Sequence, residues 1–468
     1  MGTDVEIRSC QQTGLTARLV EFIVGTRYEN IPAEVIRLAK YSFLDTLGLA
    51  LGGMTEPAPQ ILTRYVKTQG GIPTATILTQ GFKTCAPFAA LVNGTAGDVA
   101  GWSDVSVIQM NHPSVSICPA AWAVGEQLGS SGKDILLAHI AGTEVANKIG
   151  AGIRPGFQLK GWHPVAVLNT FGAAAAVGKL LKLDFTQMAN ALGIAGAEAS
   201  GIRAAMGTMS KAYGAGRSAR DGITCALLAS MGFTGPTDVL EARDGFLQTF
   251  GDGCSGANIL EHLGDPFEFV SPGISLKKFP SCTRSHNAIQ GVLDLIKKNG
   301  FKSDDVELVE CLVTPAVADF LKFSSPRTKF EAKYSMEFCV AAALLDGNVT
   351  ISSFSDTKVR DSTIVSLMQR VKMTVWAEYA KDGYNPPYAP YGCVVKIKLR
   401  NGKELSERID QGPWVSQNAP SWDEVVEKYR SNAELVLKKD AVDQSIAMVK
   451  NIERLENITH LVDKLRLA

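Results

Sequence analysis

Apolar residues recur every three to four positions from about residue 15 to 265, which is the spacing of one face of an α-helix. The pattern predicts helices over 16–26 and 31–53, and both of these stretches reach glycines near their ends. Later helical stretches, rich in Ala and Gly, lie at 87–101, 169–181 and 188–201. Small side chains let helix axes approach closely, so this region predicts a tightly packed multi-helix core.

The pattern changes after Pro272, where alternation typical of β-strands appears. The strand-like stretches are 306–315, 371–379 and 394–409. The last of these predicts a hairpin whose turn is Asn401-Gly402. Between the strands, residues 334–348 predict a helix that ends at a glycine.

Helical patterning returns at Ser421, where the sequence SWDE is a capping box, and two further helical stretches follow. We therefore expect a mainly α fold with an α+β lid. A large all-helical domain would be built from both chain ends, residues 1–272 and 413–468. Residues 273–412 would form the smaller α+β domain.

The charges of the chain balance, because 47 Lys and Arg residues accompany 47 Asp and Glu residues among 468. The lack of a basic excess argues against nucleic-acid and membrane partners. An anionic ligand would therefore have to be bound by a local group of cations.

Nine cysteines are scattered singly without a CxxC spacing, which predicts free thiols in a reducing compartment. The opening MGTDVEIRSCQQTG carries charges and no apolar core, so we expect no signal peptide. The uncharged stretch 161–178 is rich in alanine and includes His163 and Pro164, which favours a buried helix over a membrane span. We expect a cytoplasmic protein, with an organelle as the alternative.

Two of the six histidines, His112 and His163, share a pattern in which a His-Pro pair opens an apolar segment of small residues. Proline is favoured in the first helical turn, so each histidine is expected at or just before a helix N-terminus. Free N–H groups and the helix dipole there lower the imidazole pKa and favour a bound anion. His286, shortly after Ser281, has a similar setting. The alternative is a purely structural role for each histidine.

Residues 209–222, MSKAYGAGRSARDG, bring Lys211, Arg217 and Arg220 together among glycines. Flexible backbone and cations suit an anionic ligand, and a partly desolvated Lys211 could act as a base. A solvated loop is the alternative. The GxxxxGK[ST] spacing of a phosphate loop is absent.

Cys282 and His286 lie four residues apart, which suits a metal site, a thiolate with its base, or a pocket wall. The HExxH and CxxC spacings of metal sites are absent, so we expect no metal. No neighbouring residue marks an orienting third group for a nucleophile. The sequence also lacks GxSxG and a GxGxxG that follows a strand.

Six regions in order resemble signatures of the MmgE/PrpD family, which includes 2-methylcitrate dehydratases, cis-aconitate decarboxylase and iminodisuccinate epimerase. They are 31–53, 89–98 with 111–120, 161–184, 209–222, 277–289 and 334–347. The resemblance runs nearly end to end. It implies a large helical domain with a smaller α+β lid, a homodimer, and an active site in the cleft between the domains. It also implies that no metal or organic cofactor is needed.

The resemblance implies site residues as well. His112, His163 and Lys211 match catalytic and substrate-contacting positions of the family. Cys282 falls where animal cis-aconitate decarboxylases have a histidine, and His286 matches a histidine four positions later. The resemblance thus assigns SCTRSH to the pocket wall on the lid side, without a metal.

One departure concerns an acidic run, Asp-Phe-Asp-Asp, that family dehydratases and decarboxylases usually carry before the first histidine. Here the corresponding stretch is GWSD, residues 101–104, and only Asp104 matches its end. Gly214 also stands where many relatives have histidine. If the first aspartate is needed for dehydration or decarboxylation, this chain performs neither.

All three family reactions make or break a bond beside a carboxylate, so we expect proton abstraction on a small di- or tricarboxylate. His163 and Lys211 would flank the reacting carbon. The candidate catalytic residues are His112, His163, Lys211 and Asp104, and the candidate substrate-binding residues are Trp102, Tyr213, Arg217, Cys282 and His286.

A 2-methylcitrate dehydratase-like lyase is the expected activity. The alternatives are an iminodisuccinate epimerase-like isomerase, in which Lys211 opposite a histidine would suffice, and a cis-aconitate decarboxylase-like lyase. A silent polycarboxylate binder is the alternative outside the enzymes.

Overall fold

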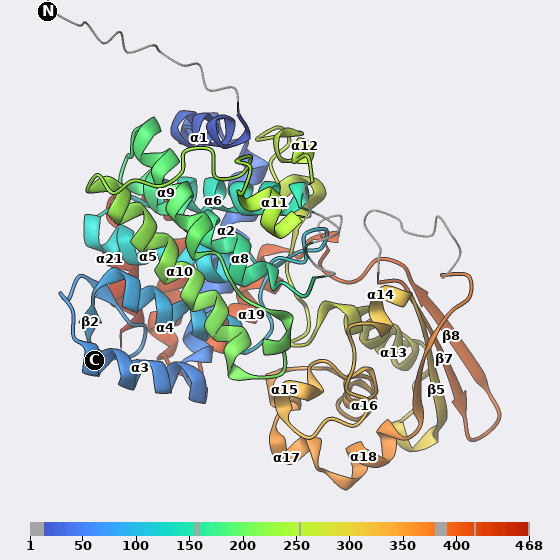
Figure 1. Ribbon diagram of the computed structural model, residues 1–468. Helices are drawn as coiled ribbons and strands as arrows, with labels where there is room; N and C mark the ends of the chain where they lie inside the picture. Colours follow the sequence, from blue (N-terminus) through green and yellow to red (C-terminus); the bar gives the residue numbers. More distant parts are fainter. Residues whose placement is uncertain are drawn as a thin grey trace, which may run out of the picture.

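The computed structural model describes residues 14–153, 157, 160–251, 254–379, 391–415 and 418–466. Two large hydrophobic cores organise these residues. Figure 1 shows a large helical body beside a smaller α+β body. The predicted opening segment with Cys10 lies almost wholly outside the described residues. The mainly helical fold with a small mixed sheet confirms the predicted fold class.

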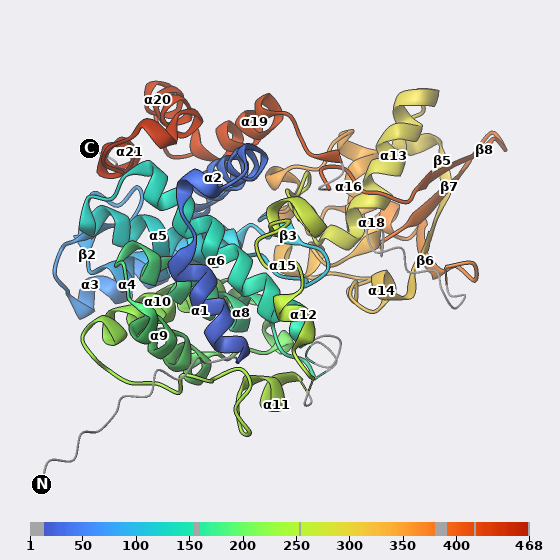
Figure 2. The ribbon, with the colours of Figure 1, turned by 90° about the horizontal axis from the view of Figure 1, so that it is seen from above.

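The helical body contains long helices from both parts of the chain. Its main helices are α1 (Leu15–Gly25), α2 (Ala33–Gly53), α3 (Pro57–Gln69), α4 (Ala86–Val99), α5 (Ser114–Leu128), α6 (Gly132–Gly152), α8 (Pro164–Leu180), α9 (Phe185–Glu198), α10 (Met209–Ser230), α19 (Trp422–Ala433), α20 (Lys439–Lys450) and α21 (Thr459–Val462). Short helices α11 (Phe246–Gly251) and α12 (Ala257–Leu260) follow α10. Helix α19 packs against α2, so the chain returns to its first core after building the second (Figure 2).

The α+β body contains a four-stranded sheet in the order β6-β5-β7-β8. Its strands are β5 (Val306–Val313), β6 (Val371–Val375), β7 (Cys393–Leu399) and β8 (Glu404–Ile409). Strand β5 runs parallel to β6 and antiparallel to β7, and β7 pairs antiparallel with β8. Helices α13 (His286–Asn299) and α16 (Met336–Asp346) pack in the same core as the sheet. The shorter helices of this body are α14 (Pro315–Ala318), α15 (Lys329–Ala332), α17 (Asp356–Val359) and α18 (Ser362–Met368).

Several local predictions are confirmed by these elements. The hairpin turn holds Gly402 at a φ of 86°, which glycine adopts without strain. Ser421 caps α19 with Glu424 in the predicted capping box. The boundary at 272 stays a prediction, since Ile274 and Leu276 still pack in the helical core.

The alternative of a solvated loop for residues 209–222 is wrong. These residues form the first part of α10, a helix of 22 residues, in spite of their three glycines. Close packing explains the glycines, because α10 crosses α4 at Gly94 and Gly216. A Cβ on Gly216 would lie 2.0 Å from the carbonyl oxygen of Leu91. The absent side chains let the two backbones approach.

The eight described cysteines are unbridged, and five of them are buried. No helix in the described ranges has both the length and the apolar character needed to cross a membrane.

Replacing Gly216 with Ala should destabilise the protein by at least about 1–3 kcal/mol, because the added methyl group collides with the backbone of α4. Chemical denaturation monitored by circular dichroism measures this change. The control is Gly25→Ala in α1, where nothing lies within 4 Å of the new Cβ and no destabilisation is expected. Equal stability of the two variants would contradict the close helix crossing.

Candidate active site

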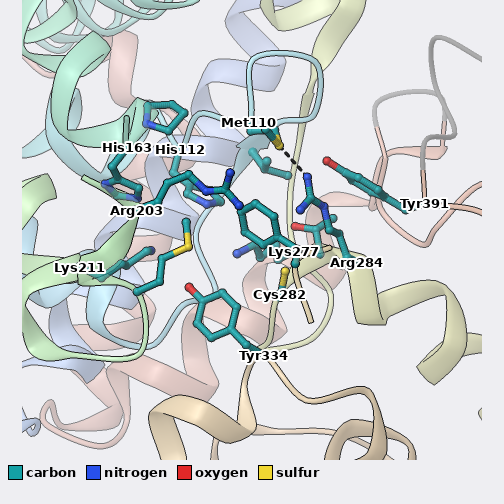
Figure 3. Close-up of a pocket in the computed structure, with 15 residues that line it drawn as sticks. Met110, His112, His163, Arg203, Lys211, Lys277, Cys282, Arg284, Tyr334 and Tyr391 are labelled. Atoms are coloured by element: carbon teal, nitrogen blue, oxygen red, sulfur yellow. Dashed lines mark hydrogen bonds between the residues drawn. The ribbon is translucent and has the colours of Figure 1, made fainter. Parts of the chain in front are cut away.

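A pocket lies where the helical body meets the α+β body (Figure 3), and about 610 Å³ of space there, open solvent included, is not filled by protein atoms. Its lining residues are Val105, Met110, His112, His163, Pro164, Arg203, Met206, Lys211, Lys277, Cys282, Thr283, Arg284, Phe320, Tyr334 and Tyr391. Four of these side chains are cationic, and none of the described lining residues is acidic. The pocket therefore offers positive charge to a ligand.

His112 directly precedes Pro113, the N-cap residue of α5. Its Nδ1 lies 2.5 Å from the carbonyl oxygen of Asp104, so Nδ1 carries the proton of this hydrogen bond. Burial, and then the charge of Lys277, holds the pKa of His112 well below its usual value. A neutral ring that donates from Nδ1 keeps Nε2 as its basic atom.

His163 is the N-cap residue of α8, whose first residue is Pro164. The His163 side chain is buried, and the backbone N–H of this residue donates to the carbonyl of Gly201. Burial lowers the pKa of His163 to about 3, and the charges of Lys211 and Arg203 add to this shift. His163 is therefore neutral at physiological pH, like His112.

Lys211 lies in the first turn of α10, which begins after the N-cap residue Thr208. Its Nζ lies 2.6 and 2.8 Å from the two carboxylate oxygens of Asp98 on α4. The Asp98 side chain is fully buried, and that of Lys211 is 11% exposed. The glycine crossing of α4 and α10 brings the two helices that carry this ion pair together.

Lys277 adds another cationic side chain to the pocket lining, from the start of the α+β segment. Its Nζ donates to the carbonyl of Gly101 at 2.9 Å. Burial lowers the pKa of Lys277 to about 7, with a further contribution from the charge of Lys211. An ammonium with this pKa exchanges a proton readily near neutral pH.

Lys428 of α19 lies behind the pocket and fixes its backbone. Its ammonium lies 2.7 Å from an Asp45 carboxylate oxygen. It donates to the carbonyls of Trp102 and Lys277 at 2.8 and 3.0 Å. The C-terminal part of the chain thereby positions both the segment before His112 and the residue that carries a pocket ammonium.

Phe320 lies between two arginines from different bodies. The guanidinium carbon of Arg284 is 3.6 Å from the centroid of the ring, and that of Arg203 is 4.6 Å away. Cation–π attraction stabilises both contacts. This stack joins the segment after α9 to the α+β body across the pocket.

The structure brings His112, His163, Lys211 and Cys282 together at the pocket, as lining residues. Asp104 does not line it: the buried carboxylate accepts hydrogen bonds from the N–H and hydroxyl of Ser114. Burial raises the pKa of Asp104 to about 7. Asp104 contacts the site through its backbone carbonyl oxygen, which accepts the hydrogen bond that orients His112.

The other predicted substrate contacts also lie outside the pocket lining. Trp102 is buried beneath the Lys428 ammonium, 4.8 Å from its ring centroid. Arg217 donates to the carbonyls of Ala166, Glu198 and Ser200 and pairs with Asp221. Two further residues sit elsewhere: Tyr213 is partly exposed on α10, and His286 is buried against Phe279.

Sequence reasoning missed several lining residues, namely Met110, Arg203, Lys277, Arg284, Phe320, Tyr334 and Tyr391. A signal existed for Lys277 and Arg284, which lie inside the family-like segment 277–289. Tyr334 opens another such segment. Nothing local marks Arg203 or Phe320, since their position depends on how the two bodies meet.

Within the described residues, no group of three or more His, Cys, Asp or Glu side chains is placed to hold a metal ion.

Comparison with known proteins fits this architecture. Residues 17–255 match the MmgE/PrpD N-terminal domain, and residues 279–454 match the MmgE/PrpD C-terminal domain. The chain belongs to the MmgE/PrpD family. The family membership expected from the six regions is thus confirmed.

Curated members of the family align over most of the chain. The chain is 28% identical to the cis-aconitate decarboxylase of Homo sapiens, over 97% of this chain and 94% of that protein. It is 25% identical to the cis-aconitate decarboxylase of Aspergillus terreus, over 97% and 96%. The 2-methylcitrate dehydratase of Salmonella typhimurium is 21% identical, over 88% and 89%.

Asp98→Asn should destabilise the protein by about 3–5 kcal/mol, because it leaves the buried Lys211 ammonium without its counter-ion. Adding Lys211→Met should recover part of this stability, which a double-mutant cycle of denaturation measurements detects. Additive losses in the double variant would contradict the ion pair.

Proposed function

We propose that the protein is a cofactor-independent decarboxylase of a small polycarboxylate, with cis-aconitate as the first substrate to test. The observation that carries this proposal is a pocket with four cations, two neutral histidines and no acidic lining residue among those described. The higher identity to relatives named cis-aconitate decarboxylase than to those named 2-methylcitrate dehydratase favours decarboxylation over the dehydration first expected.

Decarboxylation of such an acid needs a place for an electron pair and a source of one proton. The bond between the methylene carbon and its carboxylate breaks, and carbon dioxide leaves. The electron pair moves into the neighbouring double bond, which shifts by one carbon and places negative charge next to another carboxylate. A proton then adds to the former vinyl carbon and gives an unsaturated dicarboxylate.

The charges of the pocket suit this sequence. Fixed cations stabilise the developing negative charge, and they need no reorganisation during the reaction. Lys211, paired with Asp98, lies beside His163 (Figure 3). The neutral histidines add polar contacts to the substrate and carry no charge of their own.

In this proposal Lys277 donates the proton. Its pKa of about 7 makes the ammonium a stronger acid than an ordinary lysine, so it can protonate a carbanion and regain a proton from solvent. Tyr334 adds a neutral hydroxyl, because burial raises its pKa. Figure 3 shows that hydroxyl pointing into the pocket.

The GWSD stretch is compatible with this scheme, in which the proton comes from Lys277 and Asp104 serves through its carbonyl. Dehydration is the second candidate reaction, because the chain is also similar to family members named 2-methylcitrate dehydratase. The epimerase and the silent binder remain predictions that the same assay tests.

Incubating the purified protein with cis-aconitate in deuterated water should release carbon dioxide and place one deuterium in the dicarboxylate product, detected by NMR. Parallel samples contain 2-methylcitrate and iminodisuccinate. Loss of water from 2-methylcitrate, or deuterium exchange of iminodisuccinate, without decarboxylation of cis-aconitate would refute the proposal in favour of the corresponding alternative. Binding without any reaction would support the silent binder.

The value of kcat/KM for decarboxylation should be constant below about pH 7 and fall about tenfold per unit above it, because deprotonation of Lys277 removes the acid. The fall in kcat should occur at higher pH, since a bound polyanion raises the pKa of the ammonium.

Lys277→Arg keeps the charge but removes an exchangeable acid, so activity should fall by roughly 10²–10⁴-fold. Lys278→Arg is the matched control, since its ammonium pairs with Gln290 outside the pocket lining. Retention of near-normal activity by Lys277→Arg would assign Lys277 a charge role and contradict its role as the acid.

A further inference from the structure

Arg284 stands across the pocket from Lys211 and His163 (Figure 3). It lies in the short 3₁₀ turn Thr283–Ser285 and is only 7% exposed. The guanidinium thus enters from the α+β side, whereas Lys211 and the two histidines come from helix starts of the helical body. A substrate in the pocket would lie between these two groups of side chains.

The orientation of Arg284 is fixed by its neighbours. Its guanidinium carbon lies 3.6 Å from the ring centroid of Phe320 and 5.2 Å from that of Tyr391. Its Nη2 donates to the thioether sulfur of Met110 at 2.7 Å. Met110 has a φ of 52°, an unfavourable value for a residue other than glycine, so its loop is held by the surrounding structure.

Arg284 lacks the counter-ion that a buried cation usually has. No carboxylate pairs with it among the described residues, and no group there accepts a hydrogen bond from its buried Nη1. Its one acceptor, a thioether, is weak. Arginine stays charged at all relevant pH values, so it cannot relieve its burial by losing a proton.

We propose that Arg284 binds a carboxylate of the substrate at the end remote from the departing carbon dioxide, and thereby selects a tricarboxylate over a dicarboxylate. The planar guanidinium presents Nη1 and Nη2 side by side, which matches the two oxygens of a carboxylate. Stacking on Phe320 and Tyr391 keeps that plane in place before the ligand arrives. This inference rests on the proposed function and names its specificity residue.

Calorimetric titration tests the inference without turnover. The ligands are propane-1,2,3-tricarboxylate, which has no double bond to accept the electron pair, and 2-methylbutanedioate, which lacks one terminal carboxylate. The wild-type protein should bind the tricarboxylate about 10- to 100-fold more tightly. Arg284→Gln should bring this ratio close to one, mainly by weakening tricarboxylate binding.

Arg284→Lys should restore only part of the ratio, because an ammonium keeps the charge and loses the paired geometry. It also serves as the second variant if Arg284→Gln does not fold. Arg360→Gln, at an exposed arginine of the same body, is the matched control and should leave the ratio unchanged.

An unchanged ratio in both Arg284 variants, or no binding of the tricarboxylate by the wild type, would overturn the inference. A ratio that depends on Arg284 in a protein that does not decarboxylate cis-aconitate would support the binding role and refute the proposed function. The two failures are therefore distinguishable.

Discussion

One buried ammonium holds together three distant parts of the chain. The Lys428 ammonium forms an ion pair with the carboxylate of Asp45 and donates hydrogen bonds to the carbonyls of Trp102 and Lys277. Burying an ammonium is costly unless it is paired and hydrogen-bonded, so these segments are held at one spacing. The pocket backbone on both sides of the junction between the bodies depends on that spacing.

Burial acts differently on the cationic and the imidazole side chains of the pocket. Lys211 has its own carboxylate partner, the fully buried Asp98 on α4. The histidines lose their charge because burial and nearby cations act in the same direction on their pKa values. The result is a cavity with four cationic side chains and no acidic one among its described lining residues, bordered by groups that are polar and uncharged.

The sequence predicted what depends on local periodicity and local chemistry. Helix starts at His112 and His163 followed from proline, and the hairpin followed from alternation around Asn401-Gly402. The α10 glycines were ambiguous because a turn and a close helix crossing both require a missing side chain. Arg203 and Phe320 could not be paired from sequence, since they meet only through the junction of the two bodies. Arg217 is the opposite case: its charge suggested a ligand contact, but its N–H groups donate to backbone carbonyls.

The ammonium from α19 has a consequence for synthesis on the ribosome. The fifteen described lining residues have all been translated once residue 391 is added, yet the group that anchors Trp102 and Lys277 comes 37 residues later. A nascent chain therefore carries all the described lining residues before the lysine that anchors Trp102 and Lys277 has been made. The anchor of Trp102 and Lys277 is complete only after α19 has packed against α2.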